Sequence, residues 1–241
     1  MSLIRILAFS SSRFGNTEYL ETNIPVIKNF IGSKPTNIAF IPFAAADNNY
    51  EEYGLRVSAA LNNLPYRIEI AFPQNAKSVI GKNNLIIVGG GNTFKLLYNI
   101  YDLNLLDLIR DKVNNGAPYI SWSAGSNILA PTIGTTNDMP IIEPKSFNAL
   151  GLFPFQINPH YFNKKIEGFN GETRDDRLEE FLQVNPGIPI LALPEGTGLQ
   201  LENNILKYFG NDEGVLFYYE KEATHFTRKK IKNGKDLSFL L

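Results

Sequence analysis

The sequence contains no cysteine, and this absence limits both its architecture and its chemistry. Disulfide bonds, thiolate metal sites and a cysteine nucleophile are all excluded. Histidine is nearly as scarce, with only His160 and His225 in the whole chain. Any covalent chemistry therefore falls to an oxygen or lysine nucleophile, and any imidazole base is one of two residues.

The chain also has little net charge. Its 23 lysines and arginines nearly balance its 24 acidic residues, the formal charge is −1, and the two signs are interspersed. This distribution predicts no nucleic-acid-binding surface and no polybasic membrane patch, so we expect a small molecule or a peptide as partner. The apolar run over residues 1–9 is too short to span a membrane and resembles a first strand more than a signal peptide. We therefore expect a cytoplasmic protein.

Short apolar runs alternate with helical patterns along the first half of the chain. Runs that are apolar throughout predict strands buried on both faces, and the alternation predicts an α/β fold with a mostly parallel central sheet between helices. In such folds, ligands bind beyond the carboxyl ends of the strands. The length and the hydrophobic content of 44% suit a single domain over residues 1–241. We expect strands near residues 3–9, 37–43, 66–72, 84–88 and 118–122, and helices near 18–30, 50–61, 95–99 and 103–113.

The second half of the chain changes character. Extended segments are expected at 153–158 and 188–193, with a helix between them that ends near Val184. Apolar residues alternate on both sides of Asn203-Asn204, which predicts a hairpin, and residues 215–219 predict a further strand. We interpret this region as an antiparallel C-terminal extension, with the basic residues 228–230 on a solvated surface.

The segment from Pro118 to Asn127 has the pattern of a nucleophile elbow. An apolar strand stops at Ser123 among small residues and continues into a helical pattern. The strained turn requires small neighbours, which Ser121, Ala124 and Gly125 provide. Such a turn exposes the Ser123 hydroxyl above the carboxyl edge of the sheet and directs the Ala124 amide toward a developing oxyanion. The alternative is a tight turn with a capping serine.

A serine nucleophile needs a base, and the base needs a group that orients it. His160 follows an expected strand on the same carboxyl edge, so we predict it as the base and assign His225 to the surface. Glu195 lies between Pro194 and Gly196 directly after another strand, where an imidazole would be a suitable partner. Asp138, in the polar loop 131–140, is the rival carboxylate.

Six segments, in order, resemble the motifs of the peptidase E family, the α-aspartyl dipeptidases. The resemblance spans nearly the whole chain, although Ser121 and Ser126 stand where the family usually has glycine and alanine, and Ser121 is expected to place a second hydroxyl near the site. The segments are Gly90–Phe94, Trp122–Gly125, Pro131–Pro140, Gln156–His160, Gly171–Arg174 and Leu193–Gly196.

This resemblance implies a serine peptidase on a flavodoxin-like fold akin to class I glutamine amidotransferases, acting on dipeptides with an N-terminal aspartate. It implies no metal and no organic cofactor. By this resemblance Ser123 is the nucleophile, His160 the base and Glu195 the third member of the triad. The oxyanion amides are then those of Gly91 and Ala124.

Recognition of an N-terminal aspartate has its own demands. The side-chain carboxylate needs a cation, for which an arginine fork is well suited, and Arg174 in the Gly-Glu-Thr-Arg motif is the choice that the resemblance supports. Asp138 either receives the substrate ammonium or organises its loop. Three questions stay open: whether the chain is instead a cyanophycinase-like peptidase of other specificity, whether it is a catalytically silent binding protein, and whether it is a monomer or a homodimer.

Overall fold

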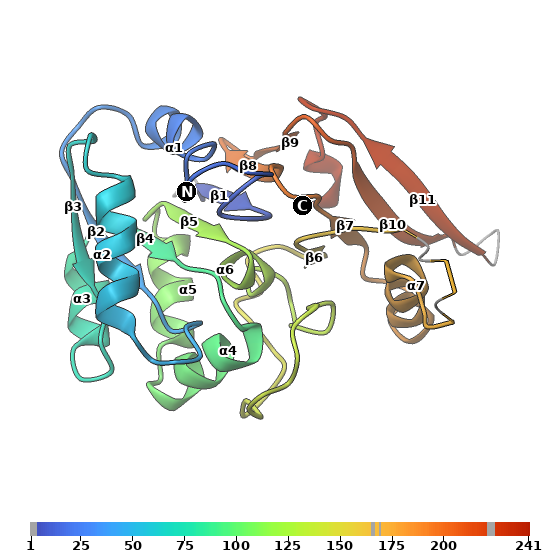
Figure 1. Ribbon diagram of the computed structural model, residues 1–241, viewed down its shortest axis with the longest axis horizontal. Helices are drawn as coiled ribbons and strands as arrows, with labels where there is room; N and C mark the ends of the chain where they lie inside the picture. The colour runs from blue at the N-terminus through green and yellow to red at the C-terminus, as the bar shows by residue number, and fades with distance from the viewer. Residues whose placement is uncertain (1–3, 165–166, 169, 221–224) are drawn as a thin grey trace.

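Two sheets make up the framework of the protein (Figure 1). The computed structural model describes residues 4–164, 167–168, 170–220 and 225–241. The central sheet has seven strands in the order β3-β2-β4-β5-β1-β8-β9, and a second sheet has four in the order β11-β10-β7-β6. Within the described residues, no helix has both the length and the hydropathy needed to cross a bilayer.

Strands and helices alternate along the first half of the chain, and strands predominate toward its C-terminus. In chain order, the elements are β1 (Ile6–Phe9), α1 (Ile24–Ile31), β2 (Thr36–Ile41), α2 (Tyr50–Ala60), β3 (Tyr66–Ile70), α3 (Ala76–Lys82), β4 (Leu85–Val88), α4 (Thr93–Asp102), α5 (Leu106–Asn114), β5 (Tyr119–Trp122), α6 (Ala124–Asn127), β6 (Gln156–Asn158), α7 (Arg174–Val184), β7 (Ile190–Ala192), β8 (Gly198–Glu202), β9 (Ile205–Phe209), β10 (Gly214–Glu220), β11 (His225–Ile231) and the 3-10 turn η1 (Ser238–Leu240).

The mostly parallel central sheet predicted from the sequence is confirmed. Its strands β3, β2, β4, β5 and β1 are parallel, and β8 joins β1 antiparallel. Alternate residues of β2 face opposite layers: Ile38 and Phe40 pack in the cluster that contains residues of α1 and α2, whereas Ala39 and Ile41 pack with α3, α4 and α5. The continuous apolar runs of these strands therefore reflect burial on both faces.

Several element boundaries differ from the expectations. The helix expected from residue 18 begins only at Ile24, because Pro25 is suited to the first turn of a helix and the preceding residues form turns. The seven-residue helix α3 had no counterpart among the expected elements, since it is too short for a clear period. The basic segment 228–230 is exposed, as expected, but belongs to strand β11.

The strands that precede His160 and Glu195 belong to the second sheet, not to the edge of the central one. The strand β8 occupies the free edge of β1, so β6 and β7 pair in parallel with one another and β10 pairs antiparallel with β7. This corrects the expectation that one sheet carries every catalytic candidate. The largest core cluster nevertheless includes Ile6 and Val88 from the central sheet and Ile157 and Leu193 from the other side, so a single core spans both sheets.

Helix α7 covers the second sheet, where Leu178 and Leu182 pack in one cluster with Phe217. A buried carboxylate fastens the helix to β11. Asp175, 5% exposed, accepts hydrogen bonds from the Tyr161 hydroxyl at 2.6 Å and from the guanidinium of Arg228 at 2.6 Å. Arg228 therefore connects the last strand to the helix that carries Arg174 at its start.

Replacement of Arg228 should loosen this attachment. Arg228→Gln leaves the Asp175 carboxylate with one fewer donor, but the arginine side chain is 44% exposed, so solvent screens part of the loss. We expect the free energy of unfolding to fall by about 1–2 kcal/mol, less than for a fully buried pair. Urea denaturation measures this change in the free energy of unfolding. Lys230→Gln is the control, because Lys230 lies on the same strand as Arg228 but forms its ion pair, with Glu213, at the surface. Equal losses in both variants would contradict the assignment.

Candidate active site

Ser123 lies in a strained turn between β5 and α6. Its backbone angles are φ +53° and ψ −119°, a conformation uncommon for residues other than glycine. The Ser123 amide donates to the carbonyl oxygen of Phe9 at 3.2 Å. Gly125 allows the new helix to press against the sheet, since a Cβ there would lie 2.4 Å from the carbonyl oxygen of Val88. The backbone thus has the geometry that the sequence predicted for a nucleophile elbow.

The two serines that differ from the usual elbow residues interact with each other. The hydroxyls of Ser121 and Ser126 are 3.0 Å apart, both residues are fully buried, and Ser126 also donates to the Phe9 carbonyl at 2.7 Å. The Ser121 hydroxyl is therefore engaged inside the elbow. The second hydroxyl expected near the site is thus bonded to Ser126, and Ser121 is not among the residues that line the cavity beside Ser123.

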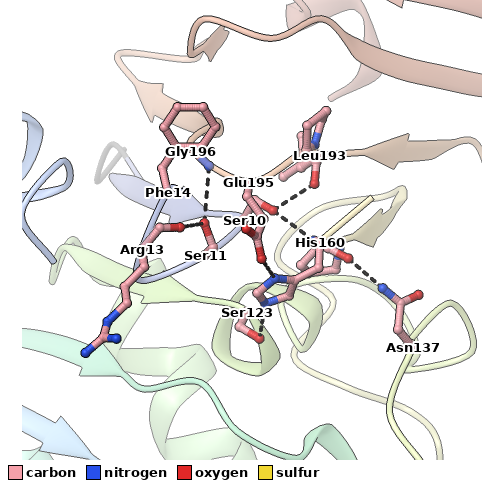
Figure 2. Close-up of polar contacts among 12 residues, drawn as sticks. Ser10, Ser11, Arg13, Phe14, Ser123, Asn137, His160, Leu193, Glu195 and Gly196 are labelled. Carbon is pink, nitrogen blue, oxygen red and sulfur yellow. Dashed lines mark hydrogen bonds and ion pairs between the residues drawn. The ribbon is translucent and has the colours of Figure 1, made fainter. Parts of the chain in front are cut away.

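A chain of three side chains connects the two sheets at the elbow (Figure 2). The Nε2 atom of His160 is 2.9 Å from the Ser123 hydroxyl oxygen, and its Nδ1 is 2.7 Å from Oε1 of Glu195. An ionised carboxylate only accepts hydrogen bonds, so Nδ1–H donates to Glu195 and the lone pair of Nε2 accepts the serine proton. This arrangement can deprotonate the hydroxyl. The other histidine, His225, has a side chain outside the described residues, so its assignment to the surface stays a prediction.

The backbone of His160 is also in an uncommon conformation, with φ +52°. The preceding peptide is held by Asn137, whose side-chain amide donates to the Pro159 carbonyl at 2.7 Å. Asn158 in turn donates to the side-chain oxygen of Asn137 at 2.6 Å. Sequence reasoning did not assign a role to either asparagine. Their positions within two motif segments were the available signal, but an isolated asparagine is more often a turn residue.

The glycine turn after β4 lies against the elbow. A Cβ on Gly90 would come within 2.8 Å of the Cβ of Ser123, so the two segments are in direct contact. Gly91 has φ +135°, and a Cβ there would lie 2.3 Å from the Ala44 carbonyl oxygen. Within the described residues, the amides of Gly91 and Ala124 donate no hydrogen bond to protein. Both remain able to donate to an oxyanion.

Among the described residues, Asp138 forms no hydrogen bond with His160 and instead accepts from the first amide of helix α4. Its Oδ2 atom accepts from the Thr93 amide at 2.7 Å and from the Thr136 hydroxyl at 3.3 Å. The Asn92 side chain also donates to the carbonyl oxygen of Met139 at 2.8 Å, so the loop is attached to α4 at two points. Of the two carboxylates that the sequence left open as partner of His160, the structure places Glu195 there and Asp138 on the loop.

Arg174 begins helix α7 and is half-buried. Its guanidinium donates to the side-chain oxygen of Asn137, which links it to the peptide that precedes His160. Within the described part of the chain it forms no ion pair, and its Nε is buried without a hydrogen-bond partner. Burial, with a smaller contribution from the charge of Arg177, lowers the pKa of Arg174 below its usual value. A bound carboxylate of any kind would relieve that cost.

A cavity of about 680 Å³ opens beside the triad. Ser123, His160 and Asp138 lie on its wall, whereas Arg174 is not among its lining residues. Residues of α2 also line this cavity, and among them the Tyr53 hydroxyl donates to the Gly90 carbonyl at 3.0 Å and accepts from the indole of Trp122 at 3.1 Å. Burial raises the pKa of Tyr53, which keeps this hydroxyl protonated. Among the described residues, no group of three His, Asp or Glu side chains could hold a metal ion.

Comparison with known proteins agrees with this geometry. The profile of peptidase family S51 matches residues 6–208. The chain belongs to peptidase family S51. Within this family it is 47% identical over 223 residues to a peptidase E of Nostoc sp., covering 92% of each chain, and 46% identical over 216 residues to a peptidase E of Haemophilus influenzae, covering 89% of this chain and 97% of the relative. This S51 member is thus a serine-type peptidase.

Solved structures bear on the fold. A peptidase from an acI-B1 Actinobacterium superposes with a TM-score of 0.70 at 16% sequence identity, covering 98% of this chain and 97% of that one. At this identity the likeness concerns the fold alone. It confirms the predicted flavodoxin-like architecture of this S51 peptidase.

The conformation of Gly91 leads to a prediction about stability. Gly91→Ala places a Cβ against the backbone of Ala44 at a φ that other residues rarely adopt, which costs about 1–3 kcal/mol for the backbone alone. We expect the free energy of unfolding, measured by urea denaturation, to fall by at least that amount. Gly81→Ala is the control: Gly81 lies in α3 with open space around its Cβ position, so that variant should be stabilised by about 0.5–1 kcal/mol. A Gly91→Ala protein of wild-type stability would show that the turn adapts.

Proposed function

We propose that this S51 peptidase hydrolyses dipeptides with an N-terminal aspartate through an acyl-enzyme on Ser123. The observation that carries the proposal is the unbroken hydrogen-bonded chain from Ser123 through His160 to Glu195, at 2.9 and 2.7 Å. The peptidase E relatives support the substrate class, since they match the chain over nearly its full length.

Acylation begins with the Ser123 hydroxyl. His160 Nε2 accepts its proton while the oxygen bonds to the carbonyl carbon of the substrate aspartate. Glu195 holds the imidazole in the tautomer that leaves Nε2 unprotonated, and stabilises the imidazolium that forms. The carbon–nitrogen bond then breaks, and His160 returns the proton from Nε2 to the leaving amine.

Deacylation follows the same route with water in place of the hydroxyl. A water molecule loses a proton to Nε2 and attacks the ester carbon, after which the imidazolium protonates the Ser123 oxygen. Aspartate is released and the enzyme regains its starting state. This series of steps requires neither a metal nor an organic cofactor.

The oxyanion of each tetrahedral intermediate is assigned to the amides of Gly91 and Ala124. Contact between Gly90 and Ser123 supports this assignment, because it places the glycine turn, which includes Gly91, against the elbow that carries Ala124. Two fixed donors there stabilise charge that develops only during reaction, and each such donor contributes about 2.7–4 kcal/mol in comparable enzymes.

The substrate aspartate side chain is assigned to Arg174. Its guanidinium donates to Asn137, whose side-chain amide in turn donates to the peptide carbonyl that precedes His160. Its Nε is buried without a hydrogen-bond partner. Asp138 reaches the cavity while one of its oxygens caps α4, so we assign it both roles that the sequence left open: it orders the loop and offers negative charge to the substrate ammonium.

Three further points belong to this proposal. The single peptidase domain over residues 1–241 is supported by the core cluster that spans both sheets. The proposed location is the cytoplasm. The assembly is a monomer or a homodimer, with peptide as the partner.

The substrate class can be tested with four peptides. We expect rapid hydrolysis of Asp-Leu and only trace hydrolysis of Glu-Leu, Asn-Leu and N-acetyl-Asp-Leu, because the site is assigned a short carboxylate and a free ammonium. Ser123→Ala should lower kcat by about 10³–10⁶-fold, as loss of a triad nucleophile does in other serine enzymes. Amine release measured by chromatography follows all reactions.

Two results would separate the parts of this proposal. Labelling of Ser123 by a fluorophosphonate without cleavage of any of the four peptides would leave a serine hydrolase of other specificity, such as a cyanophycinase-like peptidase. A folded protein that is neither labelled nor active would point to a binding protein.

Arg174 can be tested by its effect on discrimination. Arg174→Gln removes the charged donor, so kcat/KM for Asp-Leu should fall by roughly 10- to 150-fold, and the preference over Asn-Leu should shrink by the same factor. The matched control is Arg177→Gln, because Arg177 is an exposed arginine on the same helix and lies 3.7 Å from Glu172. A uniform loss for both peptides would assign Arg174 to support of Asn137 instead of to substrate binding.

A further inference from the structure

Ser10, the residue directly after β1, is fully buried and makes three hydrogen bonds to the second sheet and its connections. Its hydroxyl donates to the Leu193 carbonyl at 2.7 Å and accepts from the His160 amide at 2.8 Å. Its own amide donates to the Thr197 carbonyl at 2.8 Å. Because the single hydroxyl proton is given to Leu193, the oxygen is oriented to accept from His160 (Figure 2).

The contact at His160 meets a specific need of the backbone. With φ +52°, this residue has left the extended conformation of β6, and among the described residues its amide has no backbone carbonyl as acceptor. Ser10 provides the acceptor for that amide, while Asn137 donates to the carbonyl of the same peptide group at 2.7 Å. The peptide between Pro159 and His160 is therefore held at both ends, which fixes the direction in which the imidazole leaves the backbone.

Ser10 also shares its framework with the nucleophile. In the parallel pairing of β1 with β5, Phe9 is opposite Trp122, so Ser10 and Ser123 are the next residues on adjacent strands. The Ser123 amide is bonded to the Phe9 carbonyl. The base comes from the other sheet, and the hydrogen bond to Ser10 connects its backbone to the sheet that carries the nucleophile.

We propose that the Ser10 hydroxyl is a positioning residue for catalysis, which holds the His160 peptide so that Nε2 reaches the Ser123 oxygen. This inference rests on the proposed roles of Ser123 and His160. It concerns a residue outside the triad and the oxyanion amides, in a segment where the sequence indicates only the end of a strand.

A neighbouring contact gives the same segment a second connection. The Ser11 hydroxyl accepts from the Gly196 amide at 3.2 Å and donates to the Arg13 carbonyl at 2.6 Å, beside the turn that carries Glu195. Ser11 contacts the turn but not His160, so the effects of the two serines can be separated. Loss of the Ser10 hydroxyl removes the acceptor of the His160 amide and one donor to the Leu193 carbonyl, so both of its effects are expected to reach the nucleophile through the position of the base.

The test measures the rate at which a fluorophosphonate labels Ser123, which does not depend on peptide specificity. Ser10→Ala should be labelled about 10- to 100-fold more slowly than the wild type, since small displacements of catalytic groups have effects of this size. With Asp-Leu as substrate, kcat should fall by a similar factor while KM stays within about 2-fold. In a His160→Ala background, adding Ser10→Ala should change the residual rate by less than about 2-fold, because its effect passes through the base.

Controls distinguish positioning from general support of the fold. Asn83→Ala removes a buried side chain that also makes two hydrogen bonds, to Val79 and Glu69, at the other edge of the sheet, and it should keep the wild-type labelling rate. If Ser10→Ala does not fold, Ser10→Cys keeps nearly the same shape with a weaker acceptor and should still be labelled more slowly. Wild-type labelling of a folded Ser10 variant, or a further loss in the His160→Ala background, would overturn the proposal. No labelling of the wild-type protein would instead remove the proposed role of Ser123.

Discussion

The hydrogen bond between Ser123 and His160 crosses from one sheet to another, and the rest of the site depends on keeping it short. The nucleophile is fixed by the end of β5, whereas the base follows β6 in the second sheet. Both residues have positive φ, so each needs surrounding contacts that hold an unfavourable backbone conformation. The hydrogen bonds of Ser10, Asn137 and the Ser121–Ser126 pair meet that need.

Much of this organisation could be predicted from the sequence, because the features concerned are local. The apolar runs identify the strands of the central sheet, and small residues around Ser123 identify the elbow. The positions of His160 and Glu195 after apolar strands also indicate them as candidates, although the sequence leaves Asp138 as a rival carboxylate and only the hydrogen bond of His160 to Glu195 decides between the two. The order of the six motif segments along the chain is what supports the family resemblance, and it requires no knowledge of contacts between them.

The remaining features depend on pairing between distant segments, which local patterns do not encode. A strand before His160 gives no indication of which sheet it enters, because an apolar run suits either. The role of Asp138 depends on where the loop meets α4, 45 residues earlier in the chain. Ser10 illustrates the same limit, since its two side-chain partners lie 150 and 183 residues away.

The connection from β7 to β8 has a consequence for how this architecture can change in evolution. Residues 193–197 carry the chain from the second sheet back to the central one, and Glu195 lies within them. Ser10 binds the carbonyls of both Leu193 and Thr197, the two ends of that connection. An insertion or deletion there would alter the connection between the two sheets and, at the same time, displace the Glu195 carboxylate. The C-terminal sheet therefore cannot be exchanged as an independent module, and length variation is expected to accumulate in turns such as Asn203-Asn204, where no catalytic candidate lies.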